Sequence, residues 1–349
     1  MCFDVLVVGA GPAGAVCART LALAGHRVLL VDDVRSSNRK VGENLIGAAR
    51  PLLRDLGLLP WVELSEPVTC SGTLSAWGED VLRSNDFIRD PNGIGWCLDR
   101  PRFDSCLREA AIAVGAQWRQ VRLNAVQKDS AGWRASLSDG VVSARWIIDA
   151  SGRRSILARR LGVSRRQDSD LVALYTWRQS QSQETRTVVE SSPHGWWYTA
   201  TLPHERQVVA LHVGAADASH IMRKQSEWSD LLAATQHIRG KCEPATPASL
   251  FSTDASGSSL DSWGGERWLA VGDAALAFDP LSSQGIFNAL YTGLRGAQAV
   301  IGALAGRQQT LTKYSQQLMS IREAYLHQVA HFYQAEQRWR GYPFWDSRG

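Results

Sequence analysis

Three observations predict an α/β fold for this chain of 349 residues. A short apolar run, Phe3–Val8, is followed by a glycine-rich turn and then by a helical pattern. A second apolar run, Arg27–Val31, completes a strand–helix–strand unit, and a further apolar run follows at Trp268–Val271. Apolar runs without alternation are typical of strands buried on both faces of a parallel sheet. We therefore expect a parallel sheet that begins at the N-terminus and is completed by later segments.

The turn after the first strand reads Gly9-Ala10-Gly11-Pro12-Ala13-Gly14. Gly9 permits the tight turn, Gly11 lets the backbone approach a pyrophosphate, and Gly14 lets the helix pack closely on the strand. The free N–H groups of the helix N-terminus, beside Pro12 and Ala13, favour phosphate binding. This unit predicts a dinucleotide site of the Rossmann type, and by itself it does not separate NAD from FAD.

An acidic residue ends the second strand of the unit. Asp32 stands where a carboxylate accepts hydrogen bonds from ribose hydroxyls and disfavours a 2′-phosphate. Asp33 is a neighbour that could take the same role.

Composition argues against several other classes of protein. The net charge is +4, with Lys and Arg spread along the chain, so we expect no nucleic-acid partner. No apolar run approaches the ~20 residues of a membrane span. The six cysteines form no CxxC or Cys/His spacing, so we expect no metal site and buried, reduced thiols in a cytoplasmic protein.

The pattern of elements predicts two interleaved domains and a tail. We expect a discontinuous dinucleotide-binding domain of residues 1–60, 95–165 and 262–306, a β-sheet-rich substrate domain of residues 61–94 and 166–261, and a C-terminal helical segment of residues 307–349. The stretch 61–94 reads as short strands and turns, and Gly285–Leu304 reads as a helix.

Two later segments resemble flavin-binding elements of the FAD-dependent hydroxylase superfamily. Gly272-Asp273, directly after the strand Trp268–Val271, resembles the second flavin fingerprint, whose Asp contacts the ribityl chain and pyrophosphate. Asp149, followed by Gly152, resembles the middle Asp-Gly element of the same superfamily. With the N-terminal turn, these elements imply that the cofactor is FAD.

Three further segments resemble geranylgeranyl reductases and flavin-dependent halogenases. The Gly42-Glu43 pair resembles their Gly-Glu segment, and Arg100 resembles the arginine that reaches the polar chain of the flavin. The loop that contains Pro280, Ser282, Gly285 and Ile286 resembles the one beside the isoalloxazine in the halogenase branch. A helix that begins near Gly285 would aim backbone N–H groups at the flavin N1/O2 edge.

The sequence departs from the tryptophan halogenases at several positions. No lysine occurs between Lys40 and Lys128, although those enzymes need one near the substrate. Ser282 stands where they carry a glutamate, and their Trp-x-Trp-x-Ile-Pro motif is absent from the Gly195–Pro203 region. Three tryptophan-containing segments, Ser75–Gly78, Gly95–Arg100 and Gly195–Tyr198, resemble instead the halogenase-like maturases of tryptophylquinone amine oxidases, the lysine and glycine oxidase maturases.

Four residues are the candidates for catalysis. Glu43 is the best polar candidate near the flavin, and Ser282 belongs to the isoalloxazine loop. His194 is the nearby histidine that could act as a base, and Trp197, with Trp196, is expected to flank an aromatic substrate. The alternative, that these tryptophans fill gaps in the core, stays open.

The resemblance implies an FAD-dependent monooxygenase that hydroxylates an aromatic ring through a flavin C4a-hydroperoxide. The substrate would be aromatic, and a tryptophan in the precursor protein of a quinone-cofactor oxidase is one such substrate. NAD(P)H or an external flavin reductase would supply the electrons. The alternatives are a flavin-dependent halogenase, a prenyl-chain reductase of the geranylgeranyl type, and a non-catalytic FAD-binding maturation factor.

Overall fold

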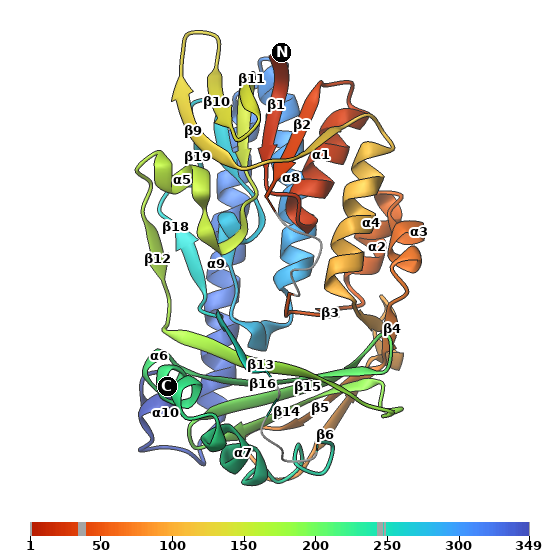
Figure 1. Ribbon diagram of the computed structural model, residues 1–349, viewed down its shortest axis with the longest axis vertical. Coiled ribbons are helices and arrows are strands. Elements are labelled where there is room, and N and C mark those ends of the chain that lie inside the picture. The colour runs from red at the N-terminus through yellow and green to blue at the C-terminus, as the bar shows by residue number, and fades with distance from the viewer. Residues whose placement is uncertain (1, 34–39, 243–246, 248, 349) are drawn as a thin grey trace.

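A computed structural model describes residues 2–33, 40–242, 247 and 249–348. Two large sheets lie one above the other, and helices cover the back and one side of the upper sheet (Figure 1). No helix in this described part is both long and apolar enough to cross a membrane. The α/β class predicted from the sequence is confirmed.

The upper sheet has the order β19-β20-β11-β1-β2-β8. Its parallel strands are β1 (Cys2–Val8), β2 (Val28–Asp32), β8 (Gln117–Gln120), β11 (Gly140–Asp149) and β20 (Trp268–Ala270). The antiparallel strands β9 (Leu123–Lys128), β10 (Trp133–Leu137) and β19 (Gly264–Gly265) extend it. Strand β1 is almost entirely buried, as its unbroken apolar pattern predicts.

Two helices cross the back of the upper sheet in close contact. Helix α1 (Pro12–Leu23) begins at the glycine turn, with Pro12 in its first turn, where a missing N–H costs nothing. Helix α8 (Gly285–Leu304) packs against α1, and a Cβ on Gly293 would lie 2.4 Å from the carbonyl oxygen of Ala13. The two backbones therefore touch where the helices cross.

The other side of α1 packs against a second group of helices. These are α2 (Ala49–Asp55), α3 (Leu59–Leu64) and α4 (Arg100–Ile112). Asp99 caps α4 by accepting a hydrogen bond from the backbone N–H of Arg102.

The lower sheet has the order β17-β13-β16-β15-β14-β5-β6. Its strands are β17 (Phe251–Asp254), β13 (Leu171–Gln179), β16 (Arg206–Gly214), β15 (Gly195–Leu202), β14 (Arg186–Ser192), β5 (Gly72–Ala76) and β6 (Arg83–Asp86). Helices α6 (Ala215–Arg223) and α7 (Ser226–Ala233) lie below it (Figure 1). The face that these helices leave free points to the upper sheet.

Two small sheets and several one-turn elements connect the large sheets. One small sheet pairs β3 (Asn44–Leu45), β7 (Gly95–Cys97) and β4 (Val68–Cys70), and the other pairs β12 (Arg165–Gln167), β18 (Ser258–Leu260) and β21 (Leu276–Ala277). The short helices are α5 (Ile156–Arg160) and the 3₁₀ turns η1 (Phe87–Arg89), η2 (Gly152–Arg154), η3 (Gly272–Ala274) and η4 (Pro280–Ser282).

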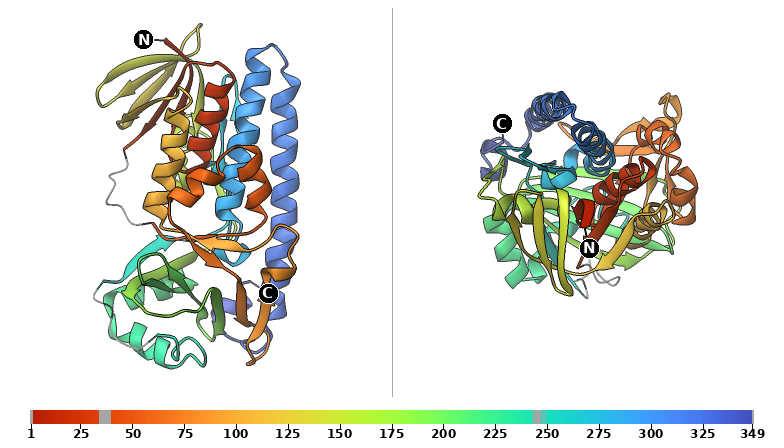
Figure 2. Two further views of the ribbon diagram at one scale, coloured as in Figure 1. Left: turned by 90° about the vertical axis from the view of Figure 1, so that its right-hand side faces the viewer. Right: turned by 90° about the horizontal axis from the view of Figure 1, so that it is seen from above.

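The C-terminal segment ties the two levels together. Helix α9 (Gln309–Ala335) runs beside α8 and continues down past the lower sheet (Figure 2). Near the end of α9, the carbonyl oxygen of Phe332 accepts a hydrogen bond from the indole N–H of Trp77 at 2.7 Å. The chain then ends in α10 (Pro343–Asp346), whose Phe344 and Trp345 are buried.

The structure differs from the sequence-based expectation in three places. The stretch expected as strands and turns begins within α3, so the expected division between residues 60 and 61 falls inside a helix. Helix α6 follows β16 directly and was not expected. Five cysteines are buried, but Cys2 is exposed because it lies at the free start of β1, so its expected burial is wrong.

The crossing of α1 and α8 leaves no room for a side chain at Gly293, which can be tested by substitution. We expect Gly293→Ala to lower the free energy of unfolding by about 1–3 kcal/mol, because the added methyl group must push the two backbones apart. Gly240→Ala is the control, since its Cβ would meet only His237 O at 3.6 Å. Urea denaturation of both variants measures the difference, and equal stability of the two would contradict this packing.

Candidate active site

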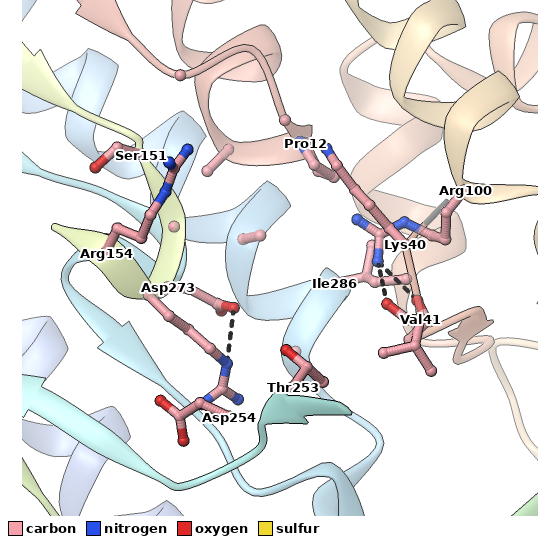
Figure 3. Close-up of a pocket in the computed structure, with 18 of the residues that line it drawn as sticks. Pro12, Lys40, Val41, Arg100, Ser151, Arg154, Thr253, Asp254, Asp273 and Ile286 are labelled. Atoms are coloured by element: carbon pink, nitrogen blue, oxygen red, sulfur yellow. Dashed lines mark hydrogen bonds and ion pairs between the residues drawn. The ribbon is translucent and has the colours of Figure 1, made fainter. Parts of the chain in front are cut away.

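A cavity of about 550 Å³ opens between the upper and the lower sheet. It begins where β1 and β2 end, and residues from η2, η3, α8 and the free face of the lower sheet also line it (Figure 3). The carboxyl ends of parallel strands are where open α/β sheets bind ligands. The twelve expected site residues that line it are Gly9, Gly11, Pro12, Ala13, Asp32, Asp33, Glu43, Arg100, Asp273, Pro280, Gly285 and Ile286.

The glycines of the turn divide into two kinds. Gly9 has φ +109°, and a Cβ there would lie 2.2 Å from the carbonyl oxygen of Ala150, while a Cβ on Gly14 would lie 1.8 Å from that of Gly9. At these two positions any larger residue would clash with backbone atoms of the protein, whether or not a ligand is bound. Gly11 has an ordinary φ of −73°, and its Cβ would meet nothing within 4 Å. The space before Gly11 belongs to the cavity, which fits a pyrophosphate approaching the N-terminus of α1.

The acids at the end of β2 have different partners. One carboxylate oxygen of Asp32 accepts the backbone N–H of Ala10 at 2.7 Å, which holds the side chain at the cavity as a ribose partner requires. Asp33 forms ion pairs with Arg122 at 3.3 Å and Arg154 at 3.8 Å. Asp33 is therefore engaged by cations.

Two cationic side chains, Arg100 and Lys40, also line the cavity. The guanidinium of Arg100, labelled in Figure 3, donates to the carbonyl oxygen of Gly42 at 2.7 Å. It also pairs with Asp104 at 3.3 Å. Lys40 bonds the other oxygen of Asp104 at 2.8 Å. These two cations lower the pKa of the Asp104 carboxyl, although its burial acts in the opposite direction. The buried carboxylate thus positions both cations at the cavity wall.

The remaining cofactor-facing residues come from the last third of the chain. Asp273 in η3, labelled in Figure 3, pairs with Arg153 at 3.7 Å, and both residues line the cavity. The 20-residue helix α8 begins at Gly285, whose Cβ would also meet nothing within 4 Å. Its N-terminal N–H groups and the positive end of its dipole therefore face the cavity, as a negatively charged flavin edge requires.

Glu43 is a buried acid on the cavity, with 2% of its surface exposed. One oxygen accepts the indole N–H of Trp177 at 3.0 Å, and the other accepts the backbone N–H of Gly42 at 2.8 Å. Burial raises the pKa of the Glu43 carboxyl above its usual range, and the two hydrogen bonds and Arg100 oppose this shift.

Three expected cofactor residues support the site without lining the cavity. Gly14 lies where α1 packs directly against the backbone of Gly9. Asp149 is fully buried, and it accepts hydrogen bonds from Ser151 and from the backbone N–H groups of Leu157 and Ala158. Gly272 has φ +60°, and a Cβ there would lie 2.6 Å from the Cβ of Ala13. Gly14 thus lies where the expected close packing of helix and strand occurs, and Asp149 and Gly272 hold the neighbouring turns. Their contact with the cofactor stays a prediction.

Three of the four residues expected in catalysis do not line the cavity. Trp197 points to the far face of the lower sheet and packs against Trp228 at 4.9 Å between ring centroids. His194 is exposed in the turn between β14 and β15, beside Tyr342. Ser282 lies in η4 and donates to the carbonyl oxygen of Asp279 at 2.8 Å, so its hydroxyl turns back on its own loop. Among these four residues, only Glu43 lines the cavity.

Trp196 lies on the wall opposite the cofactor side, as expected, but most of this wall was not expected from the sequence. This wall contains Tyr175, Trp196, Tyr198 and His212, all on the upper face of the lower sheet. The alternation of β15 places Trp196 and Tyr198 on one face and Trp197 on the other. Choosing the correct face would have required knowing which face of β15 the α6–α7 helices cover.

This arrangement defines a dinucleotide-binding flavoprotein, since the glycine turn, the acid after β2 and the start of α8 all face one cavity. The chain belongs to a family of FAD-binding domains, whose model matches residues 2–328. The predicted cofactor, FAD, and the predicted class, an FAD-dependent oxidoreductase, are confirmed.

Comparison with individual proteins agrees with the resemblance seen in the sequence. LodB of Marinomonas mediterranea, named as an FAD-dependent oxidoreductase, is 31% identical and aligns over 99% of this chain and 96% of its own length. The peptidyl tryptophan dihydroxylase QhpG, essential for tryptophylquinone cofactor biogenesis, is 26% identical, with a TM-score of 0.80 over 100% of this chain and 79% of its own. The myxobacterial chondrochloren halogenase CndH shares the fold, with a TM-score of 0.89, 24% identity and coverage of 99% and 86%.

The two kinds of glycine predict different effects of substitution. We expect Gly11→Val to abolish FAD uptake and to leave the unfolding temperature of the apoprotein near that of the parent, because the side chain fills cavity space. Gly14→Ala should instead destabilise the apoprotein itself. Flavin absorbance after reconstitution and thermal unfolding without FAD measure both effects. A Gly11→Val variant that holds FAD as tightly as the parent would refute the assignment of the turn.

The neighbouring acids predict a second contrast. Asp32→Ala should weaken FAD binding by about 1.5–3 kcal/mol, since it removes charge-assisted hydrogen bonds to the ribose. Asp33→Ala should change it by less than about 1 kcal/mol, because ion pairs of this exposure contribute little. Titration of the two apoproteins with FAD measures both affinities, and the reverse order would show that the two roles are exchanged.

Proposed function

We propose that this chain is an FAD-dependent monooxygenase that hydroxylates an aromatic ring, such as a tryptophan side chain carried by a precursor protein. The observation that carries the proposal is the wall of Tyr175, Trp196 and Tyr198, which turns three aromatic side chains toward the cofactor side of the cavity. Aromatic walls suit aromatic substrates through stacking and edge contacts. The likeness to a peptidyl tryptophan dihydroxylase supports the same substrate class.

The residues that would hold FAD are Gly11, Asp32, Arg100, Asp273 and Gly285. When bound and reduced, FAD supplies the electrons that activate O2 for transfer of one oxygen atom to a ring. The aromatic wall keeps water away from the reacting ring and orients it. Electrons come from NAD(P)H or from a separate flavin reductase.

Glu43 is the residue that handles a proton at this site. Its carboxyl lies on the cavity, and burial raises its pKa above the usual range of a glutamate, which favours the proton-carrying form. Trp177 and Gly42 hold it in one orientation.

Halogenation is the second candidate, and one observation favours it. Lys40, which precedes the lysine-free stretch of the sequence, lines the cavity. Its ammonium group is bound to Asp104 at 2.8 Å, so it is held at the wall beside Arg100. That ion pair favours a structural role for Lys40 over one in halide chemistry.

The other alternative, a prenyl-chain reductase, would need an apolar cavity wall. The polar groups of Tyr198, His212 and Asp254 on the wall suit a prenyl chain poorly.

The reaction type is tested with the FAD-loaded protein, a chemical reductant, ¹⁸O2 and excess bromide. With a tryptophan-containing peptide we expect one ¹⁸O atom in the product and no brominated peptide, tryptophan or indole, because neither a free lysine nor a glutamate at position 282 is present to hold hypobromous acid. Mass spectrometry identifies the products.

Lys40→Met is the matched variant in this experiment. If hydroxylation is the activity, Lys40→Met retains the ¹⁸O product. Brominated product from the parent that disappears in Lys40→Met would overturn the proposal and establish the halogenase.

A further inference from the structure

Tyr175 lines the cavity with a hydroxyl that the protein itself does not engage. This hydroxyl has no hydrogen-bond partner among the described residues, and it is not closed off by protein atoms as the hydroxyl of Tyr198 is. Because 8% of the Tyr175 surface is exposed, the side chain is largely withdrawn from bulk water. Buried polar groups are almost always hydrogen-bonded. A nearly buried hydroxyl that stays accessible from a cavity therefore indicates a ligand that supplies the missing partner.

The neighbours of Tyr175 on the sheet show which side of its ring is open. Phe251 on β17 lies opposite Tyr175, and the two rings stack with 5.7 Å between centroids. Trp177, two residues further along β13, contacts the ring edge-on at 5.0 Å. The other two neighbours on this face are small, since they are Ala210 on β16 and Ala173 on β13. The open space therefore lies over the two alanines, both of which line the cavity.

Two stacked rings close the far side of this space. His212 lies opposite Ala173, and Trp196 lies opposite His212. The rings of His212 and Trp196 stack with 3.6 Å between centroids and 7° between planes. Burial lowers the pKa of His212 to about 3, so its ring is uncharged near pH 7. A flat ring over the alanines would have the Tyr175 hydroxyl at one edge and neutral aromatic rings at the other.

The hydroxyl of Tyr175 keeps its proton at neutral pH. Burial raises the pKa of Tyr175 above its usual value, and the negative charge of Glu43 acts in the same direction. A protonated tyrosine hydroxyl both donates and accepts hydrogen bonds. Trp177 connects the two residues, because its indole N–H donates to Glu43 at 3.0 Å while its ring contacts Tyr175. A group bound at Tyr175 therefore lies on the same side of the cavity as this acid.

We propose that Tyr175 determines which aromatic rings bind: its hydroxyl accepts a hydrogen bond from the N–H or O–H of an electron-rich ring that lies over Ala173 and Ala210. The inference rests on the proposed function and deepens it, because it names the group that selects the substrate ring. Indoles and phenols share this chemistry. A site that pairs with this hydrogen rejects analogues that lack it, since its own polar group is then left unpaired.

The test measures binding to the oxidised, FAD-loaded protein, in which no turnover occurs. One pair of probes is N-acetyl-tryptophanamide and its 1-methylindole analogue, and the second pair is N-acetyl-tyrosinamide and its O-methyl ether. Calorimetry and the flavin absorbance follow binding. In at least one pair we expect the parent to bind the unmethylated probe about tenfold more tightly, because methylation removes the hydrogen that Tyr175 accepts. The pair that shows this ratio identifies the substrate ring as an indole or a phenol.

Tyr175→Phe removes the hydroxyl and keeps the ring. In this variant we expect the ratio to fall to within about twofold, through weaker binding of the unmethylated probe. Tyr198→Phe is the matched comparison on the same wall, and it should keep the parent ratio because the Tyr198 hydroxyl is enclosed by protein atoms. Retained flavin absorbance verifies that each variant is folded, and the ratio in the parent requires no variant.

Equal affinities within both pairs, no binding of any probe, or a ratio that persists in Tyr175→Phe would overturn the inference. A persisting ratio would show that the methyl group is excluded by its size. These outcomes are distinct from failure of the proposed function. Discrimination that Tyr175→Phe removes, without ¹⁸O incorporation, would leave Tyr175 as the recognition residue of another reaction. Incorporation of ¹⁸O without discrimination would retain the monooxygenase and remove Tyr175 from recognition.

Discussion

The close contact of α1 with the glycine turn and with α8 places the cofactor-facing groups. Side chains larger than hydrogen would meet backbone atoms at Gly14, 1.8 Å from Gly9 O, and at Gly293, 2.4 Å from Ala13 O. The glycines at the two crossings let α1 lie directly against the glycine turn and against α8. This close packing brings the N-termini of α1 and α8 to the same cavity. Two helix dipoles and their free N–H groups then act on the same space. The acid after β2 and the η3 turn reach that space from neighbouring strands.

A second constraint couples the substrate wall to the cofactor side. Asp279, beside η4, accepts a hydrogen bond from Tyr333 of α9 at 2.8 Å, and Tyr333 in turn accepts the indole N–H of Trp196 at 3.2 Å. The backbone N–H of Asp279 donates at 2.9 Å to the hydroxyl of Tyr325, which precedes Tyr333 by eight residues on α9. Burial raises the pKa of Asp279 to about 6. The C-terminal helix thus holds the loop before α8 and the aromatic wall in fixed relation, a role that its amphipathic sequence alone does not reveal.

The parts of the fold that the sequence predicted are those with strong local signals. The strand before the turn and helix α8 lie where their apolar patterns predict them, and the turn residues have the conformations that the motif demands. Helix α3 was missed because its six residues are too few to show a helical period. Helix α6 was missed because its buried residues, Ala218 and Ile221, give a short apolar stripe after a long strand.

The sequence by itself determined the cofactor site, because a glycine turn between a strand and a helix places its ligand-facing atoms within a few residues of one another. Only the tertiary structure decided the substrate wall. Both Trp196 and Trp197 are almost fully buried, one beside the cavity and the other under α7, so their hydrophobicity does not tell the faces apart. His212 reaches Trp196 only through the pairing of β15 with β16. In a strand buried on both faces the apolar pattern carries no information on direction, and a shift of one residue would exchange the two faces.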